Sequence, residues 1–483
     1  MKKLKPKVKE KKNYDENFDY MKTNKDNINN VLRDNNLLPI INEITIRTNK
    51  IVIHSYQFLK LYLLHLYENN QFFPVLDKKY ICNIFKVVTK RKCNSGGYTE
   101  EKMPKQLKTL TNFYKNHYSL TIANNEILYY DKLPYILAYE AIDIITNINN
   151  NIQAHFIDHL NKYVNIVFDI RKKREEITKN NNDKIIRKQL HKELYEEINK
   201  VKKDLITFDN FTSNANYHNW IKEQQIKLFP NKTKFQKNNI HYELKSNTQY
   251  FLYGMFHISN ELEKINKNEE KQIRLFNILP LRTNIIPKHI CIDTCCLIQN
   301  FMGDDYDSKL LSSYKKDNKY FELWNKYFKL NKRVFKKGKK YKFSYMVRTD
   351  GISCCILFIR VDTNVSKKAN IQQEENIDYI EKVNIDDIKN KKIVCADPGM
   401  SDLIYCGSYD ENNNLITFRY TQNQRRLETR MKKYSKIKDK LNKETLINEK
   451  SVKEIETTLS VLNSKTCNYE KFKTYCIEKN IIN

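Results

Sequence analysis

The most restrictive feature of the sequence is a series of three short apolar segments near the C-terminal end of the chain. KKIVCAD (391–397), DLIYCGSYD (402–410) and LITFRYT (415–421) are separated by PGMS and ENNN, which are typical turn sequences. This pattern predicts three antiparallel strands. A helix is expected next, because apolar residues then recur every three or four positions. Its apolar face comprises Leu427, Met431, Tyr434, Ile437 and Leu441.

Asp397, at the end of the first predicted strand, has two interpretations. Asp, Pro and Gly are common turn residues, and the carboxylate then serves only the turn. Alternatively, the strand order is that of an opening RNase H-like sheet. In such a sheet a carboxylate on the first strand binds Mg²⁺ together with later acidic residues, because Mg²⁺ prefers hard oxygen ligands. Gly399, without a side chain, would allow a nucleic-acid backbone to approach.

The rest of the chain divides by its hydrophobic pattern. Asp350-Gly351 joins two apolar runs and predicts a β-hairpin. ITIRTNKIVIHS (44–55) is expected to be extended, and YQFLKLYLLHLYENN (56–70) has the apolar face of a helix that ends at Asn-Asn. The pattern from about 70 to 280 is mainly helical. The predicted class is therefore α+β with several domains. These are a basic disordered tail (1–34), the first part of a β-domain (35–69), a helical lobe (70–280), the second part of the β-domain (281–362), a linker (363–389) and an incomplete α/β domain (390–483).

The charge of the chain favours a polyanionic partner. Lys and Arg number 86 against 57 Asp and Glu, which gives a formal net charge of +29. Part of this excess reflects AT-rich codons, since Asn, Tyr and Ile are abundant too. The candidates for phosphate contact are a dense lysine run before the hairpin and two arginines that open the helix after the third strand. They are Lys336, Lys337, Lys339, Lys340, Arg425 and Arg426.

The cysteines and the apolar stretches indicate the compartment. Eleven cysteines include the adjacent pairs Cys295-Cys296 and Cys354-Cys355 but no CxxC motif, which favours a reduced intracellular chain without a zinc ribbon. The basic N-terminal segment lacks the apolar core of a secretory signal. No stretch approaches the roughly 18 apolar residues of a membrane span. We therefore expect a soluble protein without a membrane partner.

Four segments, in order, carry a resemblance to a known family. VCADPGMSDLIYC and FRYTQNQRRLETRMKKY resemble the first RuvC motif and the following segment of Fanzor proteins, the eukaryotic and giant-virus relatives of transposon-encoded TnpB nucleases. VRTDGISCCILFIR looks like the hairpin of that family's wedge domain, and IPKHICIDTCCL is similar to another wedge segment. The resemblance covers roughly residues 280 to 480.

The resemblance implies an RNA-guided DNA endonuclease. The β-domain would be a wedge-type β-barrel, residues 70–280 a recognition lobe, and 390–483 the first portion of a RuvC nuclease domain. The implied partners are a guide RNA and a double-stranded DNA target, and the implied cofactor is Mg²⁺. In such proteins base pairing reads the sequence while the protein contacts backbones. The nucleus, a viral factory or a virion would be the compartment.

The chain departs from the family pattern after the first motif. Only 86 residues follow Asp397, and the family's later glutamate, cysteine pairs and aspartate have no counterparts. Asp397 alone is therefore carried over as catalytic and as a metal ligand, and the site is expected to be incomplete. Three readings stay open: an endonuclease completed by a separate C-terminal RuvC fragment, an inactive RNA- and DNA-binding remnant, and a protein that binds transposon ends.

Other polar residues have simpler interpretations. His155 and His159 lie one helical turn apart but lack the glutamate of an HExxH motif, so an ordinary structural role is favoured. The remaining acidic candidates are expected to be surface or turn residues. They are Asp293, Asp304, Asp305, Glu428, Glu444, Glu454 and Glu456.

Overall fold

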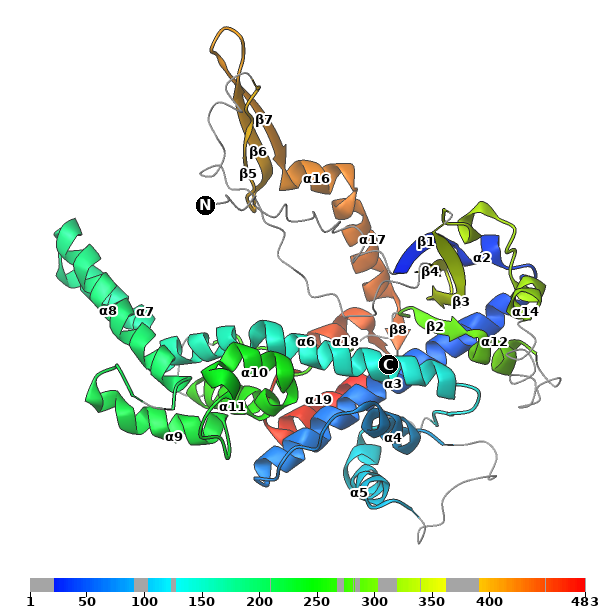
Figure 1. Cartoon of the computed structure of the whole chain (residues 1–483), viewed down its shortest axis with the longest axis horizontal. Coiled ribbons are helices and arrows are strands. Elements are labelled where there is room, and N and C mark those ends of the chain that lie inside the picture. Colours follow the sequence, from blue (N-terminus) through cyan, green and yellow to red (C-terminus); the bar gives the residue numbers. More distant parts are fainter. Residues whose placement is uncertain are drawn as a thin grey trace, which may run out of the picture. The chain divides into compact units, whose positions relative to one another are not determined.

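The computed structural model describes residues 21–90, 103–122, 127–208, 210–266, 273–280, 282, 287–302, 319–338, 340–361, 391–447 and 449–482. Within them the fold is α+β and divides into two compact units (Figure 1). The larger unit contains the described residues up to 361 and returns at 462, and the smaller contains 391–461. The linker predicted at 363–389 lies outside the described residues.

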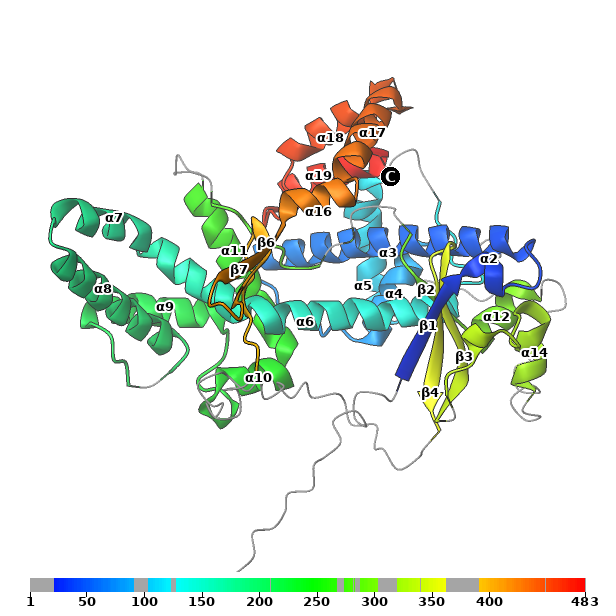
Figure 2. The same cartoon turned by 90° about the horizontal axis from the view of Figure 1, so that it is seen from above.

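Helices form most of the larger unit. The two long ones, α3 and α6, run side by side, with the α7–α8 hairpin at one end and a β-sheet at the other (Figures 1 and 2). The helices are α2 (Ile28–Val31), α3 (Leu37–Glu68), α4 (Lys78–Val88), α5 (Lys105–Phe113), α6 (Pro134–Val167), α7 (Ile170–Asn180), α8 (Lys184–Leu205), α9 (His218–Leu228), α10 (Ile240–Ser246), α11 (Leu252–Asn266), α12 (Thr294–Phe301), α14 (Tyr320–Tyr327) and α19 (Tyr469–Ile482). The helical pattern expected for 70–280 is therefore confirmed in the described residues.

Helix α3 corrects the prediction that residues 44–55 are extended. Every side chain from Ile51 to Leu64 is buried. The β-branched residues of this segment favour strands only weakly, and burial on all sides of a central helix overrides that preference. The assignment of 35–69 to a β-domain is therefore wrong, since α3 occupies most of it and packs against α4, α6 and α19.

The sheet of the larger unit is open and antiparallel. Its strands are β1 (Met21–Asn27), β2 (Ile290–Asp293), β3 (Tyr341–Thr349) and β4 (Ser353–Arg360), in the order β1-β4-β3-β2. The expected β-barrel is not formed by the described residues, because β1 and β2 lie at opposite edges. The predicted hairpin is confirmed as β3 and β4. Residues 21–34 are not part of a disordered tail, since β1 pairs along its full length with β4.

The hairpin turn is fixed by its own side chains. Thr349 Oγ1 donates to the Ser353 carbonyl oxygen and accepts from the Gly351 N–H, at 2.7 and 3.0 Å. Asp350 Oδ1 accepts from the backbone N–H groups of Ile352 and Ser353, at 3.0 and 2.7 Å. Gly351 has a φ of +90°, which disfavours any residue with a side chain. The turn is held against α2 by a bond from the Ile28 N–H to the Ile352 carbonyl oxygen.

The smaller unit contains the three predicted strands. They are β5 (Cys395–Asp397), β6 (Asp402–Tyr409) and β7 (Leu415–Thr421), in the order β5-β6-β7. A second two-stranded sheet is formed by β8 (Leu446–Ile447) and β9 (Lys450–Ser451), and α18 (Val452–Val461) follows. The expected long helix is instead two, α16 (Gln422–Glu428) and α17 (Met431–Glu444), because Arg430 has a φ of 54°.

The boundary predicted for the C-terminal domain is also corrected. Residues 462–482 belong to the larger unit, where α19 packs against α3. Lys60 of α3 donates from Nζ to the Ser464 carbonyl oxygen at 2.6 Å. Glu263 of α11 accepts from Thr466 Oγ1 and from the Cys467 N–H, at 2.6 and 2.8 Å. The smaller unit is thus an insertion between β4 and α19.

Candidate nucleic-acid interface

A basic hollow lies beside the edge strand β1 of the larger unit. It has a volume of about 870 Å³ and is formed by β1 together with the segment that precedes β3. We call it the basic hollow. Its lining residues are Asn24, Lys25, Asp26, Lys332, Arg333, Val334, Lys336, Lys337 and Gly338. Two of the lysines predicted to contact phosphate, Lys336 and Lys337, are therefore brought to one site.

Asn24 holds the two sides of the basic hollow together. Its Nδ2 donates to the carbonyl oxygens of Val334 and Lys336, at 2.8 and 3.3 Å. Its Oδ1 accepts from Lys337 Nζ at 2.6 Å, and the same amine donates to the Thr23 carbonyl oxygen at 3.3 Å. Lys337 is therefore a structural cation as well as a charge in the hollow, and it fixes the segment on β1.

Among the described residues, none of the cations of the hollow has an anionic partner. Five basic side chains line it against one acidic side chain, Asp26, which leaves an excess of four positive charges. Asp26 accepts from the Asn27 N–H and from Asn30 Nδ2, not from a lysine. The unpaired cations take part in no ion pair within the part of the chain that the structure describes, and all are exposed. They are Lys25, Lys332, Arg333 and Lys336. Exposed, unpaired cations at one hollow favour a phosphate backbone.

The remaining basic candidates lie elsewhere or outside the described residues. Lys340 is exposed but does not line the hollow. Lys339 lies outside the described residues. Arg425 and Arg426 are exposed on α16 of the smaller unit. Sequence reasoning missed Lys25, which reaches the hollow from a strand some 300 residues away in sequence. It also missed Lys332 and Arg333, although they directly precede the predicted lysine run.

Asp397 lies at the end of β5 and is exposed. It stands opposite Tyr405 of β6, which stands opposite Arg419 of β7, so the three share one face of the sheet. Arg419 forms a bidentate pair with Asp402, with nitrogen–oxygen distances of 2.5 and 3.0 Å. Asp402 is therefore already engaged, and Asp397 is the carboxylate of this face without a protein partner among the described residues.

The described residues do not fit a two-metal site. Within them no group of three or more His, Cys, Asp and Glu side chains is placed to hold a metal ion. The four later glutamates have local partners. Glu454 accepts from Ser451 and Glu444 pairs with Lys440, while Glu428 accepts from the Tyr420 hydroxyl and Glu456 from Asn442 Nδ2. The described residues of the smaller unit therefore do not by themselves form a two-metal site around Asp397.

Gly399 has a role inside its own turn. Its N–H donates to the Asp402 carbonyl oxygen at 2.8 Å, which closes the turn between β5 and β6. A Cβ at this position would lie 2.9 Å from that same oxygen. The absence of a side chain is thus explained by the turn itself, without an approaching nucleic acid.

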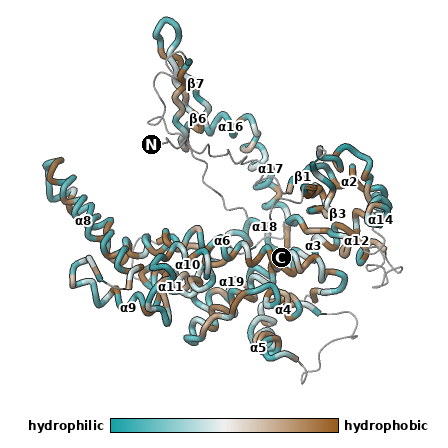
Figure 3. The backbone as a smooth tube through the Cα atoms, in the orientation of Figure 1, coloured by the Kyte–Doolittle hydropathy of each residue, from teal (hydrophilic) through white to brown (hydrophobic). Residues whose placement is uncertain are grey.

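The second face of the three-stranded sheet is apolar and uncovered within the smaller unit. Ile404, Phe418 and Ile416 are 45%, 59% and 52% exposed, and Figure 3 shows apolar stretches along β6 and β7. The apolar face expected on the following helix is exposed too, including Leu427 at 76%.

The alternative polar candidates have structural roles. His159 stacks on Phe276 with ring centroids 3.6 Å apart, and burial lowers its pKa to about 4. Asp293 caps α12 by accepting from the Cys296 N–H at 2.8 Å and also accepts from the Tyr139 hydroxyl at 2.9 Å. Asp304 and Asp305 lie outside the described residues. No helix of the described residues is long and apolar enough to cross a membrane.

The comparison with known protein families gives a match. A family model described as Domain of unknown function (DUF8286) matches residues 290–360, which run from β2 to β4 and include the predicted wedge hairpin. No curated protein matches the chain. The match includes Lys332, Lys336 and Lys337 of the basic hollow, but neither Lys25 nor Asp397.

Proposed function

We propose that this chain binds RNA and DNA as a Fanzor-like protein of the RNA-guided endonuclease class. The observation that carries the proposal is the basic hollow, in which Lys25, Lys332, Arg333 and Lys336 are exposed and unpaired. Phosphates would replace the missing anions and release counterions, so that affinity falls steeply with salt. The guide RNA and its DNA duplex are the polyanions that the resemblance implies.

Removing the unpaired cations tests the hollow. We expect the triple variant Lys332→Gln, Arg333→Gln and Lys336→Gln to bind single-stranded RNA at least tenfold more weakly at low salt. The slope of log K against log salt should become shallower by about 2, because each lost phosphate contact on a single strand contributes about 0.7. Fluorescence anisotropy over a salt series measures both quantities.

The matched control removes three exposed lysines of the α7–α8 hairpin: Lys172→Gln, Lys184→Gln and Lys188→Gln. It changes the net charge equally in the same unit. Equal weakening by both triple variants would show that general charge, not the basic hollow, binds the RNA.

We further propose that Asp397 contributes one Mg²⁺ ligand to a nuclease site that the described residues leave incomplete. With Mg²⁺ and a target duplex, the chain alone is then expected to bind without cleaving, and Asp397→Ala should leave RNA affinity unchanged. Mg²⁺-dependent cleavage by the chain alone, lost in Asp397→Ala, would contradict the incomplete site. Cleavage that appears only with a separate C-terminal RuvC fragment would support completion by that fragment.

The identity of the RNA tests the resemblance itself. The chain, purified from cells that carry its flanking genomic DNA, is expected to retain one discrete RNA species encoded next to its gene. Sequencing of the bound RNA after a wash at moderate salt gives the answer. Heterogeneous RNA that is lost as salt rises would argue against a guide, and tight binding of duplex ends without RNA would favour the transposon-end function.

A further inference from the structure

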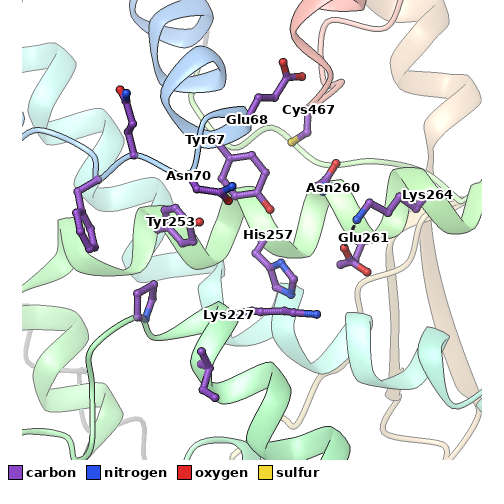
Figure 4. Close-up of a pocket in the computed structure, with 14 residues that line it drawn as sticks. Tyr67, Glu68, Asn70, Lys227, Tyr253, His257, Asn260, Glu261, Lys264 and Cys467 are labelled. Carbon is purple, nitrogen blue, oxygen red and sulfur yellow. Dashed lines mark hydrogen bonds and ion pairs between the residues drawn. The ribbon is translucent and has the colours of Figure 1, made fainter.

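A second pocket, of about 550 Å³, lies in the helical part of the larger unit (Figure 4). Its walls come from the end of α3 and the residues after it, from the end of α9, and from α11. We call it the α11 pocket. Its size is within the range of pockets that take small organic ligands.

One wall of the α11 pocket is aromatic. Tyr67 and Tyr253 lie with ring centroids 5.2 Å apart, and both face the pocket in Figure 4. Phe72 lines it as well, and its side chain is 74% exposed. An exposed phenylalanine ring that lines the same pocket as two tyrosines provides a surface on which a flat ring can stack.

The α11 pocket also contains a buried histidine, one helical turn from Tyr253 on α11. His257 is only 5% exposed and lines the pocket. Its Nε2 lies 3.0 Å from Gln224 Oε1, which also accepts from the Tyr163 hydroxyl at 2.9 Å. Because Gln224 Oε1 accepts, Nε2 carries the proton and Nδ1 is left as an acceptor, with no partner among the described residues. Burial lowers the pKa of His257 to about 4, so that the ring is neutral at physiological pH.

The charges of the α11 pocket are already balanced. Lys227 pairs with Glu223 at 2.5 Å, and Lys264 pairs with Glu261 at 2.8 Å. Glu68 accepts from the Tyr469 N–H at 2.9 Å. The pocket therefore differs from the basic hollow, whose cations are unpaired. A phosphate would therefore meet lysines that are already in ion pairs. A neutral ring with N–H donors would stack on the aromatic side chains and donate to His257 Nδ1.

We propose that the α11 pocket binds a single unstacked nucleobase of the bound nucleic acid. Stacking on the aromatic wall would supply affinity for any base, and His257 Nδ1 would accept from a base N–H. The inference deepens the proposed function and rests on it, because the base would belong to the nucleic acid that the chain binds.

Free nucleosides test the pocket without the polymer. Adenosine, guanosine, cytidine and uridine are titrated against the full chain and followed by saturation-transfer NMR of the base protons, with ribose 5-phosphate and inorganic phosphate in parallel. At least one nucleoside is expected to bind, with an affinity that does not change between low and moderate salt. Ribose 5-phosphate and phosphate are expected not to bind at this site.

Phe72→Ala is the informative variant, because a side chain that is 74% exposed can be removed without unfolding. We expect at least fivefold weaker nucleoside binding, in keeping with the measured worth of base–aromatic stacking. The matched control is Phe321→Ala, which removes a phenylalanine of α14 that is 52% exposed and does not line the pocket. A second variant, His257→Phe, keeps an aromatic ring but removes the acceptor, and it should also bind nucleosides more weakly.

The outcomes separate this inference from the proposed function. If RNA binds through the basic hollow but no nucleoside binds, or if Phe72→Ala binds nucleosides as well as the original chain does, the base pocket is overturned and the proposed function stands. If nucleosides bind but RNA does not, the proposed function is overturned and the pocket remains only a site for free nucleosides. Stronger binding of N-acetyltryptophanamide than of every nucleoside would assign the pocket to an indole side chain of a protein partner and overturn the inference.

Discussion

Gly351 and Gly338 are two glycines with positive φ in different surroundings. A Cβ at Gly351, where φ is +90°, would collide with the Asn42 side chain, whereas a Cβ at Gly338, where φ is +54°, would meet no atom within 4 Å. Both substitutions to alanine force the new residue into a region that disfavours a side chain. Only the first adds a collision.

We expect Gly351→Ala to lower the free energy of unfolding by about 2 kcal/mol or more, and Gly338→Ala by about 1 kcal/mol. Urea unfolding followed by far-UV circular dichroism measures both changes. Equal losses in the two variants would show that Asn42 gives way and that only the backbone conformation matters at Gly351.

Lys60 is a charged residue buried within α3. It is 2% exposed, its Nζ donates to the Ser464 carbonyl oxygen, and it lies 4.3 Å from the centre of the Phe472 ring. Burial lowers its pKa from 10.5 to about 8. The folded chain therefore releases this proton at lower pH than the unfolded chain does, so stability rises with pH between these two values.

Compared with Lys60→Met, the original chain is expected to gain up to about 3 kcal/mol of stability as the pH rises from 8 to 10.5. Below pH 8 the difference between the two proteins should be constant. Chemical denaturation of both proteins at several pH values tests this, and the comparison cancels cysteines and tyrosines that titrate in the same range. Parallel stability curves across that range would show that Lys60 titrates normally.

At the scale of elements, local chemistry was the reliable guide to structure. The β3–β4 hairpin was predictable because Thr349, Asp350 and Gly351 make the turn from their own atoms, and β5 to β7 because turn residues bound each strand. The first half of helix α3 was not, because its strand-like residues are helical only where neighbouring helices bury them. Strand β1 was hidden in a charged sequence, since its pairing partner β4 lies more than 300 residues away. For the same reason, Lys25 of β1 could not be assigned to the candidate site from the sequence.

The side-chain amide of Asn24 holds the segment 332–338, which lines the basic hollow, against β1. Asn24→Ala removes both donated bonds to the Val334 and Lys336 carbonyl oxygens and the acceptor for Lys337 Nζ, but it removes no charge. We expect RNA affinity to fall severalfold with an unchanged salt slope, because the same cations remain but are less well placed. Anisotropy titrations with Asn29→Ala, an exposed asparagine on the following helix, provide the control. A slope that falls with the affinity would mean that a phosphate contact was lost directly.

At the scale of the whole molecule, the chain returns from the inserted smaller unit to the larger unit at residue 462. Glu263 accepts from Thr466 Oγ1 and the Cys467 N–H, so it fixes the chain where it re-enters the larger unit. Glu263→Ala is expected to lower the free energy of unfolding by about 1–3 kcal/mol, because the Cys467 N–H loses its acceptor. The control, Glu175→Ala, removes an exposed carboxylate that pairs with Arg171 on α7 and should leave stability unchanged. Thermal unfolding that is equally affected by both would argue against this anchoring.

The insertion also sets an order of events during synthesis. Helix α3 emerges from the ribosome early, but α19, which packs against it and supplies the buried Phe472 and Cys476, emerges only after the entire smaller unit. The apolar side of α3 that α19 covers therefore remains without α19 while some 400 further residues are translated. During that interval it is a surface on which a nascent-chain chaperone would bind, and stalling translation before residue 462 should leave it open.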